Sequence, residues 1–213
     1  DYDFESPLCM DMELLNEHFA ALSRGERIFV PRYEFARHMR VIEPGQSLRL
    51  GKDEIAVFEG IHALNDDITG KNPNAFKLYI SARSNVLDAD DHVCFKGTWM
   101  RLVRRTVRDN LYRGSSASET MKMWANVRRG EKLYISPFKN KADLMLDTSF
   151  PYEVSVMRTV APQLFESVPQ GAERYDELRS ILPAFQRFEG LSVDYLAPDA
   201  LLREFVGGGV YAY

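Results

Sequence analysis

A cluster of arginines lies in the middle of the chain, in the segment 97–114, which reads G-T-W-M-R-L-V-R-R-T-V-R-D-N-L-Y-R-G. On a helix with 100° per residue, four cations share an arc of roughly 100°: Arg101, Arg104, Arg105 and Arg108. The opposite side carries apolar residues: Trp99, Leu102, Val103, Val107 and Leu111. Neighbouring guanidinium groups repel one another and are stabilised by a polyanion such as a nucleotide phosphate chain. The segment therefore predicts a helix that packs by one face and binds phosphate by the other.

The charge of the whole chain is concentrated around this segment. The 213 residues carry a net charge of −4, yet residues 96–141 hold 12 basic against 3 acidic residues, so the remainder carries −13. A basic segment in an acidic protein indicates an anionic ligand bound locally, with a solvated charged face as the alternative. Non-specific nucleic-acid binding usually accompanies a domain that is basic overall and is less favoured. The glycine-rich phosphate loop G-x-x-x-x-G-K-S/T occurs nowhere in the sequence.

The composition is that of an ordinary globular protein, with 45% hydrophobic, 12% aromatic and 27% charged residues. The sequence contains no run of 18 apolar residues, so no transmembrane helix or membrane partner is predicted. Cys9 and Cys94 are isolated, which argues against a disulfide framework and favours a reducing, cytoplasmic location. The chain begins at Asp1 without a methionine, and we expect it to be a piece of a longer protein.

Apolar patterns predict alternating strands and helices. Strands are expected over residues 28–30, 55–58, 76–82 and 143–146, and the continuous apolar run 55–58 is typical of a strand buried on both faces of a parallel sheet. Helices are expected over residues 11–24, 98–112, 116–128, 152–167, 173–188 and 198–205. Residues 31–50 are expected to form loops and short strands, and residues 83–96 a loop. This alternation favours an α/β parallel sheet with crossover helices.

Further candidate ligands lie before the arginine segment. Glu59 follows the apolar run 55–58, where an acid either binds Mg²⁺ or caps the next helix. Glu5 belongs to an acidic stretch that suits vicinal hydroxyls such as those of ribose, or simply precedes a helix. Tyr33 and His38 lie in an aromatic and basic loop that suits a nucleobase, although a lone histidine is more often structural.

Two other polar clusters lie near the arginine segment. Arg113-Gly114 ends the expected helix, and an arginine at such a hinge can swing onto transferring phosphate. The next helix has N-cap candidates in Ser115, Ser116 and Ser118, with Glu119 completing a capping box. Asp88, Asp90, Asp91 and His92 match no standard metal-site spacing, and a metal site there is not favoured. His62 and His92 are given a structural interpretation.

These motifs, taken in order, resemble those of the uridine kinase and phosphoribulokinase group of P-loop kinases. The resemblance rests on F-E-S-P, V-P-R-Y-E-F-A-R-H-M-R, V-F-E-G-I-H-A-L, R-L-V-R-R-T-V-R-D-N-L-Y-R-G and P-F-K-N-K-A-D, and it covers nearly all 213 residues. The sequences E-G-I-H-A-L-N-D, L-D-A-D-D-H, S-A-S-E-T-M-K-M-W, V-R-R-G-E and L-R-E-F-V-G-G are similar to those of bacterial nucleoside kinases that carry a threonyl-tRNA-synthetase-like N-terminal region.

The resemblance implies a role for each candidate. Glu5 takes the place of the aspartate that holds the ribose hydroxyls, and Tyr33 and His38 match residues that contact the base. Glu59 matches the acid after the Walker-B-like strand, near the metal. The lid arginines that grip ATP phosphates correspond to Arg105, Arg108 and Arg113. Ser115 and Met123 replace an arginine and a glutamine near the base, so sugar recognition is better supported than base identity.

The resemblance also implies what is missing. In this group the phosphate loop, its Mg²⁺-binding hydroxyl and the general base precede the segment that this chain matches. The first strand of the sheet would then be absent, and its exposed neighbours favour association into a homo-oligomer. The expected organisation is a kinase-like domain over residues 1–168, with a lid near 97–130, and a helical extension over 169–213.

The resemblance therefore implies an α/β, P-loop NTPase-like kinase that uses ATP and Mg²⁺ to phosphorylate the 5′-hydroxyl of a nucleoside. Arg101, Arg104, Arg105 and Arg108 are the expected ATP ligands, with Arg105, Arg108 and Arg113 acting in catalysis. Two alternatives stay open. One is a kinase of another small hydroxyl compound, such as a sugar phosphate, and the other is a regulatory module that binds a nucleotide or RNA without catalysis.

Overall fold

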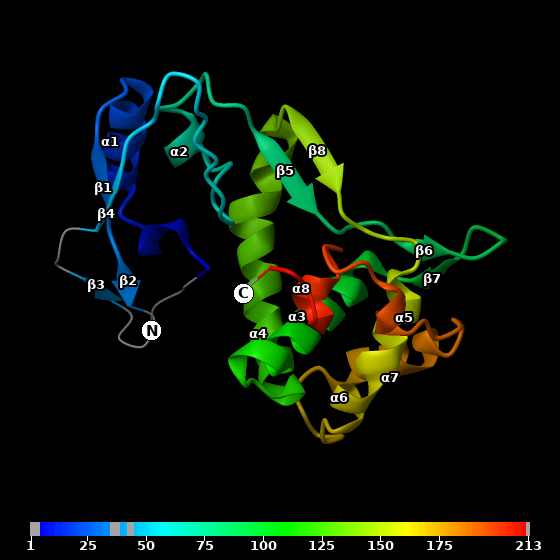
Figure 1. Ribbon diagram of the computed structural model, residues 1–213. Helices are drawn as coiled ribbons and strands as arrows, with labels where there is room; N and C mark the ends of the chain where they lie inside the picture. The colour runs from blue at the N-terminus through cyan, green and yellow to red at the C-terminus, as the bar shows by residue number, and fades with distance from the viewer. Residues whose placement is uncertain (1–4, 35–38, 42–44, 212–213) are drawn as a thin grey trace. The chain divides into compact units, whose positions relative to one another are not determined.

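The computed structural model describes residues 5–34, 39–41 and 45–211 of the chain (Figure 1). The chain forms two compact units, each assembled from two segments. Unit 1 comprises residues Asp1–Leu78 and Gly130–Leu144, and unit 2 comprises Tyr79–Arg129 and Met145–Tyr213. The expected division into a kinase-like domain over residues 1–168 and a helical extension over 169–213 stays a prediction.

The helices in the first segment of unit 1 are short and begin at side-chain caps. A 3₁₀ turn, η1 (Pro7–Cys9), precedes helix α1 (Met12–Ser23), and the carboxylate of Asp11 accepts a hydrogen bond of 3.1 Å from the backbone N–H of Leu14. The four-residue helix α2 (Asp66–Thr69) is capped in the same way by Asn65. A π-helical turn, η3 (Glu131–Ile135), and a 3₁₀ segment, η4 (Ser136–Lys141), follow in the second segment of the unit. The helix predicted over 11–24 is confirmed.

The strands of unit 1 form two small antiparallel pairs. Strand β1 (Ile28–Val30) pairs with β4 (Gln46–Leu48), with Ile28 opposite Leu48. Strand β2 (Tyr33–Glu34) pairs with β3 (Met39–Arg40), with Tyr33 opposite Arg40. The strand predicted over 28–30 and the short strands predicted within 31–50 are confirmed.

The apolar run 55–58 is not the buried strand that its sequence predicts, and that prediction is wrong. Residues 55–58 have no strand assignment, and Ile55 and Val57 are 88% and 87% exposed. Phe58 is half exposed and touches Phe19 of α1 edge-on, with ring centroids 4.3 Å apart. Within the described part of the chain no strand pairs with this run, so its side chains stay exposed despite their composition.

A parallel strand pair carries the chain between the two units. Strands β5 (Leu78–Ser81) and β8 (Leu144–Asp147) pair with each other. The backbone N–H of Leu144 donates to the carbonyl of Lys77, and the N–H of Thr148 donates to the carbonyl of Ser81, so both strands run in the same direction. The strands predicted over 76–82 and 143–146 are confirmed, and the architecture is mixed α/β (Figure 1).

A β-hairpin in unit 2 replaces the loop that was expected over 83–96. Strands β6 (Val86–Leu87) and β7 (Val93–Phe95) pair antiparallel, with Val86 opposite Phe95 (Figure 1). Phe95 is 1% exposed, and its ring lies 5.0 Å from that of Phe185. The polar composition of this segment reflects the turn of the hairpin, and the apolar residues at its two ends join the core.

Six helices of unit 2 surround the main hydrophobic core. They are α3 (Gly97–Arg113), α4 (Ala117–Gly130), α5 (Glu153–Val160), α6 (Pro162–Glu166), α7 (Tyr175–Phe185) and α8 (Arg203–Val206), with a 3₁₀ turn, η5 (Val193–Tyr195), before the last. The core includes fully buried Leu102 and Val103 of α3, Met157 of α5 and Ile181 of α7. Residues beyond 168 therefore pack on the same core as the arginine helix.

The observed helix boundaries differ from the predicted ones for local reasons. The helix predicted over 152–167 is divided in two, because Pro162 begins α6 and cannot donate to the preceding turn. The helix α7 begins only at Tyr175, because Arg174 has a left-handed backbone with φ of 62°. The helix predicted from residue 198 begins at Arg203, after a turn in which Ala200 donates to the carbonyl of Ala197.

A buried ion pair joins α3 to α5. The guanidinium of Arg104 makes a bidentate contact with the carboxylate of Glu153, with Nη2 2.7 Å from Oε2, and Nη2 also donates to the carbonyl of Thr148 at 2.8 Å. The side chains are 8% and 2% exposed. The Arg104 guanidinium also lies 5.0 Å from the ring centroid of Phe205 in α8. The pair thus stands at the junction of three helices.

None of the helices in the described ranges has the length and apolar composition needed to cross a bilayer.

Replacing Glu153 by glutamine should destabilise unit 2, because Arg104 would remain a buried cation without a counterion. Removal of one partner of a buried pair costs about 3–5 kcal/mol, whereas Glu177→Gln, which breaks a more exposed pair with Arg174, should cost at most about 1 kcal/mol. The free energy of unfolding can be measured in urea from the fluorescence of Trp99 and Trp124, both in unit 2. Equal losses for the two variants would contradict the structural role of this pair.

Candidate functional site

The ends of α3 are set by two glycines with different functions. The backbone N–H of Gly97 donates to the side-chain oxygen of Asn85 at 2.9 Å, and a Cβ at Gly97 would lie 2.5 Å from the carbonyl oxygen of Arg83. Gly114 ends the helix in the left-handed conformation, with φ of 65°, and its N–H donates to the carbonyl of Asp109. The predicted helix 98–112 is confirmed, and its length places Arg113 in the last turn.

Three arginines of α3 converge on one buried carboxylate. Asp109 has a side chain that is 2% exposed, and its Oδ1 lies 3.0 Å from Nη2 of Arg108 and 3.3 Å from Nη1 of Arg113. Its Oδ2 lies 3.3 Å from Nε of Arg105. The three arginine side chains are 24%, 25% and 56% exposed in the order Arg105, Arg108, Arg113. We call these four residues the Asp109 cluster; it combines three positive charges with one negative charge at the end of α3.

Arg104 does not share this environment. Its donors are directed to Glu153 and Thr148, and the residue is 7% exposed, whereas the helical arc placed it beside Arg101, Arg105 and Arg108 on a ligand-facing side. The geometry therefore favours a structural role for Arg104, and a contact with ATP is not supported by its position. Leu111, expected on the packed side, is 51% exposed.

Arg101 is not part of the Asp109 cluster and is less buried than Arg104. It is half-buried, and its guanidinium lies 6.0 Å from the ring centroid of Trp124 in α4. This distance is at the outer limit for a cation–π contact. Arg101 thus belongs to the surface between α3 and α4, and its predicted contact with ATP stays a prediction.

The turn after α3 leads directly into α4 through the predicted capping box. The side-chain oxygen of Ser116 accepts from the N–H of Glu119 at 3.2 Å, and Oε2 of Glu119 accepts from the N–H of Ser116 at 2.7 Å. The backbone hydrogen bond from Ser116 is the main cause of a lowered pKa for the Glu119 carboxyl. This reciprocal cap fixes the start of the helix three residues after Arg113.

The predicted acceptor ligands lie in unit 1. Glu5 is half-buried and packs so closely on Gly130 that a Cβ there would lie 2.5 Å from the Cβ of Glu5. Tyr33 is 45% exposed on β2, and Glu59 is exposed beyond the run 55–58. His38 lies outside the described residues. The Asp109 cluster is in unit 2, so the structure groups the predicted phosphate ligands together and places the acceptor ligands in the other unit.

His62 is a buried polar residue for which the sequence favoured a structural role. It is 4% exposed, and neither ring nitrogen has a hydrogen-bond partner within the described structure. Burial lowers the pKa of the imidazole, and the negative charge of Glu5 opposes this shift. The ring of Tyr134 lies edge-on to it, with centroids 6.2 Å apart. The lowered pKa of the imidazole favours its neutral form. His62 lies in the same unit as Glu5.

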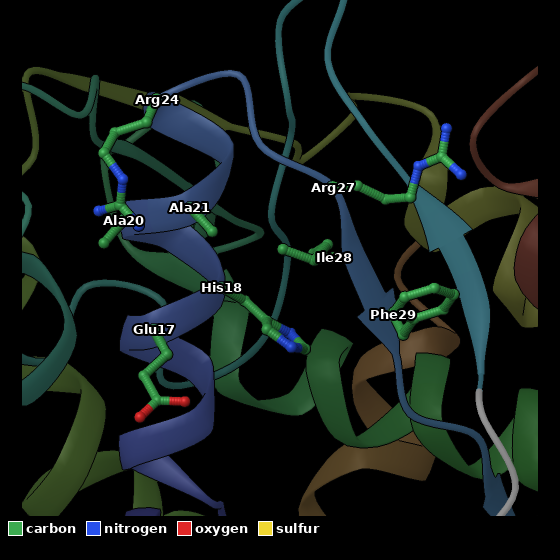
Figure 2. A pocket seen from close by; sticks show the side chains of 8 residues that line it. All are labelled: Glu17, His18, Ala20, Ala21, Arg24, Arg27, Ile28 and Phe29. Carbon is green, nitrogen blue, oxygen red and sulfur yellow. The ribbon is translucent and has the colours of Figure 1, made fainter.

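A groove with a volume of about 580 Å³ lies between α1 and the start of β1 (Figure 2). Figure 2 shows His18 extending from α1 toward Ile28, while Glu17 of α1 and Arg24, just after the helix, point to its other side. Arg24 is already paired with Glu26, with Nη2 2.7 Å from Oε2. The groove contains none of the residues predicted to bind substrate.

Asp147, at the end of β8, accepts hydrogen bonds from several donors. Partial burial alone would raise the pKa of its carboxyl, but the hydroxyls of Ser84 and Ser149 and two backbone N–H groups outweigh this and lower the pKa to about 2. The Ser84 Oγ lies 2.6 Å from Oδ2, and the Ser149 Oγ lies 2.7 Å from Oδ1. The carboxylate ties the chain after β5 to the chain after β8.

Ligand atoms of Asp88, Asp90 and His92 lie within 4.8 Å of one another in the turn of the β6–β7 hairpin. Asp90 and His92 are exposed, and Asp88 is paired with Arg187 at 2.9 Å. Exposed acidic turns of this kind occur widely without a metal, and the pairing with Arg187 offers a structural reason for Asp88.

The Asp109 cluster brings together three guanidinium groups, the side chains best suited to bind phosphate groups. A model of the Phosphoribulokinase / Uridine kinase family matches residues 1–154. The chain belongs to this family, and its α/β architecture is consistent with the P-loop NTPase-like kinase fold expected from the sequence.

Individual relatives agree with this assignment. The uridine kinase of Halobacterium salinarum is 29% identical over 150 residues, which cover 68% of this chain and 56% of the relative. The uridine kinases of Staphylococcus haemolyticus and Clostridium novyi are 26% and 28% identical over 155 residues, which cover 72% of this chain and 66% of each relative. The chain thus spans between 56% and 66% of the length of these relatives.

Replacing Ser84 by alanine should raise the pKa of Asp147 toward the ordinary value of about 3.9, because the strongest side-chain hydrogen bond to the carboxylate is removed. The stabilisation from this lowered pKa is fully present above about pH 3.9 and is lost as the pH falls toward 2. Carboxyl ¹³C NMR titration of wild type and Ser84→Ala measures the shift, with Ser23→Ala on α1 as the control. An unchanged titration of Asp147 in Ser84→Ala would show that this hydrogen bond is not formed.

Proposed function

We propose that the protein containing this chain transfers the γ-phosphoryl group of ATP to the 5′-hydroxyl of a nucleoside. The Asp109 cluster is the observation that carries the proposal, because three guanidinium groups at one helix end offer several charged donors to the oxygens of a phosphate chain. Membership of the Phosphoribulokinase / Uridine kinase family supports the reaction class, and the names of the relatives support a nucleoside as acceptor.

In the proposed reaction the acceptor oxygen forms a bond to the γ-phosphorus while the bond to the β–γ bridging oxygen breaks. The products are a nucleoside monophosphate and ADP, and the hydroxyl proton is released. Such reactions depend on positioning and on neutralisation of phosphate charge. Arg105 and Arg108 would hold the phosphates from the body of α3. Arg113 lies directly before the left-handed Gly114 and is the arginine best placed to move onto the transferred group.

The acceptor and the metal would be held by residues of unit 1. Glu5 would accept hydrogen bonds from the ribose hydroxyls, and Tyr33 and His38 would contact the base. Glu59 offers an exposed carboxylate, which is the kind of oxygen ligand that Mg²⁺ prefers. Bound Mg²⁺ would neutralise charge on the β- and γ-phosphates.

Replacing Arg108 by alanine should lower nucleoside-dependent ATP consumption by about 10²–10³-fold, the range for losing one preorganised charge donor. Arg179→Ala, at an exposed position on α7, is the matched control and should leave turnover unchanged. The assay uses the purified native protein, with its intact mass measured beside it, and a panel of nucleosides and sugar phosphates. Turnover with sugar phosphates but not with nucleosides would show that the acceptor is a sugar phosphate.

ATP consumption that does not depend on any acceptor, or equal effects of the two substitutions, would overturn the proposal. Strong salt-dependent RNA binding without nucleoside-dependent turnover would instead favour a regulatory binding module.

Replacing Glu5 by glutamine should weaken discrimination between ribonucleosides and 2′-deoxynucleosides. A hydrogen bond to a charged group contributes about 1.5–3 kcal/mol, so we expect kcat/KM for ribonucleosides to fall about 10- to 100-fold and that for deoxynucleosides to change less. Glu13→Gln, in the first turn of α1, serves as the control. An equal fall for both sugars would place Glu5 outside the ribose site.

A further inference from the structure

Asp109 is a buried carboxylate whose negative charge would be unfavourable at its position without the neighbouring arginines. It lies near the C-terminal end of α3, where the helix dipole disfavours negative charge, and its side chain is 2% exposed. Burial of a carboxylate also requires compensation by nearby cations or donors. Arg105, Arg108 and Arg113 supply that compensation.

The Asp109 cluster differs from the ion pair that serves folding in the same helix. Arg104 and Glu153 are matched one to one, and both side chains are buried. Asp109 instead faces three cations that extend to the surface, so the cluster keeps a net charge of +2. Glu153, by contrast, has a single cationic partner among the described residues and also accepts a hydrogen bond from the backbone N–H of Phe150.

The contacts with Asp109 also leave Arg108 and Arg113 partly exposed to solvent, at 25% and 56% of their side chains. Asp109 accepts hydrogen bonds from Nε and Nη2 of Arg108. Nε of Arg105 and Nη1 of Arg113 each lie 3.3 Å from the carboxylate, as ion-pair contacts rather than hydrogen bonds. A guanidinium has five N–H donors in a planar fork, so Arg108 can be oriented by Asp109 through its Nε and Nη2 edge and present another donor to an anion. The charge of Asp109 attracts Arg105 and Arg113 to the same place. Without the carboxylate, mutual repulsion would drive the three side chains apart.

We propose that Asp109 is a positioning residue that holds Arg105, Arg108 and Arg113 as one preorganised triphosphate-binding array. The inference rests on the proposed function for the identity of the ligand, and on the contacts of the Asp109 cluster for the role. Preorganised donors bind and stabilise phosphate charge without reorganising when the ligand arrives.

Replacing Asp109 by asparagine distinguishes two effects of this residue on anion binding: the position it gives to the arginines and the negative charge it places near the anion. The substitution removes a negative charge beside an anion site, so electrostatics alone would tighten anion binding, whereas loss of positioning weakens it. We expect the affinity for inorganic tripolyphosphate to fall at least about tenfold, the size of one lost charge-assisted hydrogen bond. Asp176→Asn, exposed in the first turn of α7, changes the net charge equally and should leave the affinity unchanged.

The measurement is calorimetric titration of tripolyphosphate into the folded protein, with tryptophan fluorescence used to verify folding. Asp109→Glu keeps the charge but moves it by one methylene, and it should bind with intermediate affinity. This variant decides the question if the asparagine variant does not fold. Unchanged or tighter binding by a folded Asp109 variant would overturn the inference, as would absence of tripolyphosphate binding in the wild type.

Kinetics distinguish this inference from the proposed function. With active protein, Asp109→Asn should lower kcat and raise the KM for ATP while leaving the KM for the nucleoside unchanged. If the wild type binds tripolyphosphate in an Asp109-dependent way but phosphorylates no nucleoside, the array is supported and the proposed function fails. If turnover is normal in Asp109→Asn, the proposed function is supported and the role of Asp109 is wrong.

Discussion

The ion pair between Arg104 and Glu153 determines how α3 presents every other arginine that it carries. Because Arg104 is anchored to α5 and lies against Phe205 of α8, the rotation of α3 about its own axis is fixed. Residues 105 and 108 then follow from the helical repeat of 100° per residue. Arg104 is thus used within the fold, and its burial fixes the direction in which the neighbouring arginines of α3 project. Those arginines contact Asp109 near the end of the helix.

Features defined by local sequence could be predicted. The boundaries of α3 follow from an amphipathic pattern and a terminal glycine, and the Ser116–Glu119 cap follows from residue types three positions apart. The family followed from motifs in a fixed order, and the family model matches residues 1–154. These features depend on residues that are close in the sequence, so they can be predicted without knowing which distant residues pack against them.

Features that depend on distant partners could not be predicted. The helical arc grouped Arg104 with its neighbours, and only Glu153, which lies 49 positions away, distinguishes it. Asp109 was overlooked because a single acid within a basic helix has no pattern of its own. The run 55–58 has the composition of a buried strand, but burial requires a neighbouring strand, and the described residues provide none. The apolar composition of residues 55–58 shows that the run favours burial, but it does not show whether a neighbouring strand is present to bury it.

The exposed run from Ile55 to Phe58 has a consequence for how the chain behaves as a solute. An exposed apolar segment that pairs with no strand in the described part of the chain is a template for strand addition by another molecule. A strand added beside this run would bury side chains that are exposed here. The buried core of unit 2 is formed by residues of that unit, whereas the apolar run of unit 1 has its side chains exposed.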